Sequence, residues 1–354
     1  MTKRKSISAT FLSDLSNLPT AYFALVMATG IVSIGSYNLN FIYIAKPLFY
    51  FNIVAYLFMN LLYILRALLY PKNLMDDIKD PAKSPGFLTY VAGTCVLGTQ
   101  FIVIASNFVI ASILFYIGTF AWLILIYTVF TVFTVKKNKP SINKSISGVW
   151  LLIIVSTQSV SILASQLTGH IPFANDLVSF FALVMFLCGC MFYIIIITLI
   201  VYRMSFFEMR AEEFAPAYWI NMGAVAISTL AGSSIILNVQ EWSFIAEILP
   251  FLKGFTLFFW AIGTWWIPLI VILGIWRHVF KQLPLKYHPQ YWGMIFPMGM
   301  YTACTIKLSQ AVDLHFLMMI PSFFIYIAVV AWAVAAFGMF YSVAKDYLFV
   351  KNSL

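Results

Sequence analysis

Charged residues are scarce in this sequence. Only 9% of its 354 residues are Asp, Glu, Lys or Arg, whereas 62% are hydrophobic. A soluble domain usually carries about 25% charged residues. So few charges cannot cover a water-exposed surface, which argues against a soluble enzyme, a disordered chain and a nucleic-acid-binding protein. We therefore expect a protein surrounded by membrane lipid.

Residues for catalysis and metal binding are also few. The four cysteines form no CxxC pair and lie in apolar stretches, so we expect buried, unreactive thiols. No HExxH motif occurs, and the four histidines and twelve acidic residues lie in the termini, in loops or at the ends of apolar segments. Cation pumps and proton-coupled transporters commonly bury an ionisable relay. The sequence thus argues against a metal-dependent enzyme, predicts no cofactor and weakens the case for proton coupling.

Ten apolar segments run through the chain. Most exceed about 20 residues, which is the length of a membrane-spanning helix and too long for a strand of a membrane barrel. We predict an all-α membrane protein with ten transmembrane helices in one domain over 1–354, with short cytoplasmic termini at 1–18 and 345–354. The predicted spans are 20–38, 47–69, 87–106, 108–134, 147–166, 177–202, 216–236, 250–276, 291–309 and 321–343.

Basic residues support this number of spans. With the N-terminus in the cytoplasm, 18 of the 21 Lys and Arg residues fall in the termini and loops on the inner side. Only Lys46, Lys253 and Lys307 remain on the outer side. Positive charge is enriched in cytoplasmic loops of membrane proteins. We therefore predict a multi-pass protein of the inner or plasma membrane with both termini in the cytoplasm.

The spans alternate in composition and form five tandem hairpins. The odd spans begin near an aromatic residue at a spacing of 63 to 73 residues, and they hold about twice as many small and polar residues as the even spans. Bulky apolar faces suit lipid, whereas small faces suit close packing or a wet lumen. We predict an inner ring of five odd helices around a central pore, within an outer ring of five even helices. Close helix packing alone is the competing interpretation.

Polar residues recur at helical spacing on three odd spans. These stripes are candidates for the wall of a neutral pore, although Ser and Thr also bond back to their own helix. They comprise Thr29, Ser33 and Ser36 on the first span, Gln158 and Ser161 on the fifth, and Asn221 and Ser228 on the seventh.

The ninth span reads YWGMIFPMGMYTACTIK from Tyr291 to Lys307. Pro297 removes a backbone donor and bends a helix, so the adjacent Phe296 could occlude a narrow lumen. Gly299, Met300, Ala303 and Lys307 complete the pore-lining candidates. Lys307 favours anions near the outer mouth if its face lines the pore; the alternative is a lysine that extends to the membrane interface.

This segment, together with LPTAYFALVMATG at 18–30, resembles the tellurite-resistance/dicarboxylate transporter family. That family includes bacterial tellurite-resistance proteins, fungal malate transporters and plant slow anion channels. The resemblance implies a homotrimer in which each subunit holds its own five-helix pore, closed by a phenylalanine that corresponds to Phe296. Prolines kink several inner helices in the family, whereas Pro297 is the one proline deep in an odd span here.

The expected function is transport of small anions, either C4-dicarboxylates such as malate or tellurite-related oxyanions, through a neutral pore gated by Phe296. The expected partners are these anions and membrane lipid, with no nucleic acid. A proton-coupled dicarboxylate carrier is one alternative, and a membrane sensor or intramembrane enzyme is another.

Overall fold

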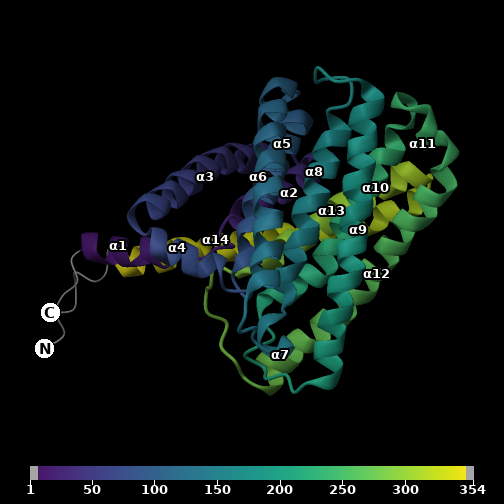
Figure 1. Ribbon diagram of the computed structural model, residues 1–354. Coiled ribbons are helices and arrows are strands. Elements are labelled where there is room, and N and C mark those ends of the chain that lie inside the picture. The colour runs from purple at the N-terminus through teal and green to yellow at the C-terminus, as the bar shows by residue number, and fades with distance from the viewer. Residues whose placement is uncertain (1–6, 348–354) are drawn as a thin grey trace, which may run out of the picture.

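The computed structural model describes residues 7–347, and the regular elements in that range are all helices, without strands (Figure 1). Shorter helices precede or separate the long ones: α1 (Ile7–Ser16) comes before the first long helix, and α4 (Pro71–Ile78), α7 (Ile142–Ser145) and α11 (Ser243–Glu247) lie between long helices. The long helices are α2 (Ala24–Asn38), α3 (Ile42–Leu69), α5 (Thr89–Ala105), α6 (Phe108–Val135), α8 (Leu152–Gln166), α9 (Asn175–Phe206), α10 (Ile220–Leu237), α12 (Leu249–Ile275), α13 (Tyr291–Val312) and α14 (Met319–Tyr347).

Eight helical segments within the described range are long and apolar enough to cross a membrane. These segments contain α3, α5, α6, α8, α9, α10, α12 and α14. The all-helical prediction and its membrane character are therefore confirmed. The other two predicted spans correspond to α2, which is apolar but has only 15 residues, and α13, which is not among the eight. A ten-span topology therefore stays a prediction.

The long helices form two layers. In the inner layer α2 packs on α5, α5 on α8, α8 on α10, α10 on α13, and α13 on α2, which closes a ring. Each inner helix also packs on the long helix that follows it in the chain. In the most apolar window of α5, α8 and α10, 72, 89 and 94% of residues are buried, against 22–39% in α3, α6, α9, α12 and α14. The second group therefore exposes the apolar faces that lipid would cover.

The close packing of α13 depends on one glycine at each of two contacts. A Cβ on Gly223 of α10 would lie 2.7 Å from the Pro297 ring, and one on Gly299 would lie 2.8 Å from Ile31 and 3.2 Å from the Val32 backbone nitrogen of α2. Real Cβ atoms essentially never come within 3.0 Å of another heavy atom, so these glycines allow α13 to pack tightly between α10 and α2.

Arginines at the ends of outer helices bind the loops that lead into inner helices. Arg203 donates to the Ile146 carbonyl at 2.7 Å and to Glu213 at 2.9 Å, while Arg277 donates to the Phe214 carbonyl. Arg66 does the same with Ser16 and Asp77. These arginines, which the sequence analysis used only to assign the cytoplasmic side, therefore also stabilise the loops that lead into the inner helices.

Candidate functional site

A cavity of about 300 Å³ lies where the inner helices begin. Five of its lining residues are within the first three positions of their helices, namely Ala24 of α2, Thr89 of α5, Leu152 of α8, Ile220 of α10 and Gly293 of α13. The loops before α2, α5 and α13 complete the wall. We call this cavity the vestibule, and it lies on the axis of the ring.

A second, much smaller cavity lies further along the same axis. Its volume is about 10 Å³, roughly the space that a single water molecule needs. All five inner helices line it, through Ile31 and Ile34 of α2, Cys95, Val96 and Thr99 of α5, Ser159 and Ile162 of α8, Ile227 and Leu230 of α10, and Met300 of α13. The wall is therefore mainly apolar.

Phe296 and Met300 line different cavities. Phe296 lines the vestibule and Met300 lines the second cavity, one helical turn further along α13. Both side chains are only 1% exposed. Pro297 lies against Gly223, and Gly299 faces α2, so the close contacts on either side fix the position of Phe296. The structure thus places the predicted gate residue in the vestibule wall, one helical turn from the α13 residue that lines the second cavity.

The predicted polar stripe of α2 faces an outer helix instead. Thr29 accepts a hydrogen bond from the Trp332 indole of α14 at 2.9 Å, and Ser33 donates to the Ala45 carbonyl of α3 at 2.7 Å. Ser36 is buried, and its hydroxyl makes no hydrogen bond to another described residue. None of the three lines the vestibule or the second cavity.

The stripes of α8 and α10 also contact neighbouring helices. Gln158 donates to the Phe186 carbonyl of α9 at 3.0 Å and to Ser228 of α10 at 3.2 Å. Ser161 donates to the Ala182 carbonyl of α9 at 2.6 Å. Asn221 is buried, and its amide makes no hydrogen bond to another described residue.

The remaining candidates, Ala303 and Lys307, belong to the C-terminal half of α13. Ala303 is buried and lines neither cavity, and Lys307 is partly buried one turn beyond it. Of the predicted pore-lining residues other than the gate pair, the two cavities thus include only Met300. The polar pattern identified buried hydroxyls correctly, but most of them satisfy their hydrogen bonds at contacts between the two rings.

These contacts follow a repeated arrangement. An aromatic side chain of an outer helix bonds a threonine of the inner helix in the next hairpin: Tyr56 to Thr94, Trp122 to Thr157, Trp260 to Thr305, and Trp332 of the last hairpin to Thr29 of the first. We call these four pairs the aromatic–threonine contacts. They join successive hairpins at four of the five junctions of the ring, all except the one between α9 and α10.

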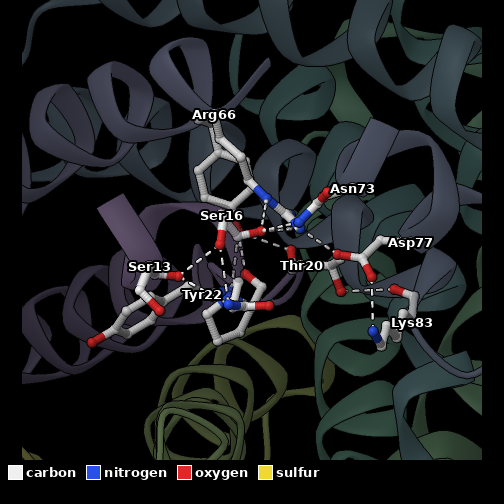
Figure 2. A network of polar contacts seen from close by, with 11 residues as sticks. Ser13, Ser16, Thr20, Tyr22, Arg66, Asn73, Asp77 and Lys83 are labelled. Carbon is white, nitrogen blue, oxygen red and sulfur yellow. Dashed lines mark hydrogen bonds and ion pairs between the residues drawn. The ribbon is translucent and has the colours of Figure 1, made fainter. Parts of the chain in front are cut away.

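Two charged residues of the vestibule wall, Asp77 and Lys83, belong to a polar network that also contains Arg66 (Figure 2). Asp77 accepts from Arg66 through one carboxylate oxygen and from the Lys83 ammonium through the other, at 2.8 Å. Thr20 donates to the Lys83 carbonyl at 2.8 Å, which fixes the loop that carries this lysine. The hydrogen bond with Asp77 raises the pKa of Lys83, whereas burial lowers the pKa of His288 on the same wall. Lys83 is therefore charged and His288 neutral near pH 7.

The cavity residues that sequence reasoning missed are mostly apolar or lie in loops. They include Met27, Thr89, Ser159, Lys83 and His288. The available signal was the helical spacing of Phe296 with Gly293 and Met300, which defines the axial face of α13 without reference to polarity. Lys83 and His288 come together through loops that lie over 200 residues apart, and no local pattern contains that information.

The ring of five helices, with Phe296 in the vestibule wall, agrees with a family match that covers most of the chain. The profile of the SLAC1 family, described as voltage-dependent anion channels, matches residues 17–340. The chain belongs to this family. The resemblance to anion transporters that was deduced from the first and ninth spans is thus confirmed.

Individual relatives agree with this membership. The SLAC1-family chain is 28% identical over 302 residues to an uncharacterized transporter of Methanocaldococcus jannaschii, which covers 83% of this chain and 85% of the relative. A second transporter of that organism is 26% identical over 82% and 84% of the two chains. The malic acid transport protein of Schizosaccharomyces pombe is 23% identical over 84% of this chain and 72% of its own length.

Proposed function

We propose that this protein transports small anions, with C4-dicarboxylates such as malate as the favoured class, along the axis of the inner ring. The observation that carries the proposal is the pair of axial cavities, one lined by Phe296 and the other by Met300. Membership of the anion channel family and the similarity to a malic acid transport protein support the substrate class. Tellurite-related oxyanions are the second class to test.

In the proposed mechanism an anion enters the vestibule from the cytoplasm and binds there, on the cytoplasmic side of Phe296. Rotation of the phenylalanine ring away from the axis joins the vestibule to the second cavity. The mainly apolar wall beyond it binds anions weakly, and weak binding permits rapid exit. All ten long helices cross the membrane in this proposal, with both termini in the cytoplasm, and the protein acts as a homotrimer of separate pores in the plasma membrane.

The decisive experiment measures malate flux into liposomes that contain the purified protein or its Phe296→Ala variant. Loss of the ring removes a steric barrier, and a barrier lowered by about 1.4 kcal/mol raises the rate about tenfold. Phe259→Ala is the matched control, because Phe259 is equally buried but belongs to α12 and lines neither cavity. Equal flux in the wild type and Phe296→Ala would reject the gate.

The same liposomes test the carrier alternative. Coupling to protons requires a titratable group in the path, and the vestibule wall contains Asp77, Lys83 and His288. We expect malate flux to follow the malate gradient and the membrane potential alone. Uphill malate uptake driven by an imposed pH gradient would establish the proton-coupled carrier instead.

A further inference from the structure

The vestibule wall contains a charged lysine, Lys83, among mainly apolar residues. Lys83, Asp77 and His288 are its ionisable lining residues, and Asn17, Thr20, Thr89 and Gln290 add polar groups. The Asp77 carboxylate is bound on one oxygen by Arg66, which is only 1% exposed, and on the other by Lys83. Together with Arg66, which does not line the cavity, Asp77 and Lys83 carry one positive charge, and the carboxylate is paired with both cations.

Lys83 has the capacity to bind a further partner. Its side chain is 57% exposed, and one of the three protons of its ammonium group is used by Asp77. His288 accepts a hydrogen bond from the Gln290 backbone amide at 3.3 Å on Nδ1, which agrees with a neutral ring that does not repel or attract an ion. A carboxylate that enters the cavity thus meets Lys83 as its cation.

Two further observations favour an anion in this space. The five inner helices all begin at the cavity, so the positive ends of their dipoles surround it. The volume of about 300 Å³ is at the lower end of the range for small-molecule pockets, about 300–1,000 Å³. The cavity is therefore large enough for a small organic anion, in contrast to the second cavity.

We propose that the vestibule is an anion-binding site in which Lys83 holds one small carboxylate on the cytoplasmic side of Phe296. This inference rests on the proposed transport function for its substrate class. Asp77 acts as a positioning residue: together with Arg66 it keeps the lysine ammonium at the cavity wall. The site would fill from the cytoplasm and set the concentration at which transport saturates on that side.

Calorimetric titration of malate into the purified full-length protein tests the site without any measurement of flux. We expect Lys83→Gln to weaken malate binding about tenfold and Lys83→Arg to restore most of it, since arginine keeps the charge. Lys79→Gln is the matched control, because Lys79 carries the same charge on an exposed position nearby and does not line the cavity. We expect this control to bind malate within twofold of the wild type.

The outcomes separate this inference from the transport proposal. No malate binding by the wild type, equal binding by Lys83→Gln and the wild type, or an equal loss in Lys79→Gln would each overturn the vestibule site. Malate binding that depends on Lys83 in a protein without flux would support the site and reject transport. Circular dichroism and gel filtration of each variant verify that the loss does not come from misfolding.

Discussion

Lys83 is held in its charged form by one neighbour. The hydrogen bond from its ammonium group to Asp77 raises the lysine pKa above its ordinary value, because deprotonation would leave the carboxylate without that partner. A raised lysine pKa means that the positive charge persists to higher pH. The charge of Lys83 is therefore independent of pH over the physiological range.

We expect malate affinity to stay constant from about pH 7 to about pH 9.5, because the raised pKa keeps Lys83 protonated. A lysine of ordinary pKa, about 10.4, would start to lose its proton near the upper limit of this range. In Asp77→Asn the stabilising carboxylate is absent, so the decline in affinity should begin at lower pH. Titration calorimetry at several pH values gives both curves. A wild-type affinity that already falls between about pH 8 and pH 9 would contradict this assignment.

At the scale of helices, α13 is the element whose position matters most. It packs between α10 and α2 through Gly223 and Gly299 and carries Phe296 and Met300 on the axial face between these contacts. A helix confined on both sides presents its axial side chains at a fixed depth. Small changes at the contacts are thus expected to move the gate residue.

Gly299→Ala tests this role of α13. The added methyl group would meet Ile31 and the backbone of Val32, and overpacking of this kind costs about 1–3 kcal/mol. Gly254→Ala in α12 is the control, because its Cβ meets nothing within 4 Å and alanine favours a helix by about 0.5–1 kcal/mol. Thermal unfolding in detergent should show a lower midpoint for Gly299→Ala only. A midpoint equal to that of the control would refute the tight contact.

The amino-acid composition of whole helices predicted which helices are buried, whereas the polarity of single residues did not predict which faces line the cavities. Bulky apolar residues identified α3, α6, α9, α12 and α14 as the exposed helices, and small residues identified the buried ones. The same reasoning could not tell which face of an inner helix meets the axis. A hydroxyl such as that of Ser33 or Thr29 is satisfied equally well by water in a pore or by an outer helix, and only the three-dimensional contacts distinguish the two.

For the whole molecule, the distribution of basic residues predicts its orientation in the membrane. The exposed loop residue Lys139 precedes α8 and should face the cytoplasm, whereas Glu241 follows α10 and should face outward. Single cysteines at these positions are labelled with a membrane-impermeant maleimide. We expect Glu241→Cys to react in intact cells and Lys139→Cys only after permeabilisation, with the wild type as the control for native cysteines. Labelling of both positions in intact cells would reject the ten-span topology.

The aromatic–threonine contact between Trp332 and Thr29 also has a consequence for biosynthesis. It joins residues 303 positions apart, so the first inner helix meets its last neighbour only when synthesis of the chain is nearly complete. At about 5–20 residues per second, that interval is roughly 15–60 s. During this time α2 lacks the surfaces that α13 and α14 later cover. Ribosome-bound chains that stop before α13 should therefore remain an open, protease-sensitive arc, because the ring closes only when α13 packs on α2.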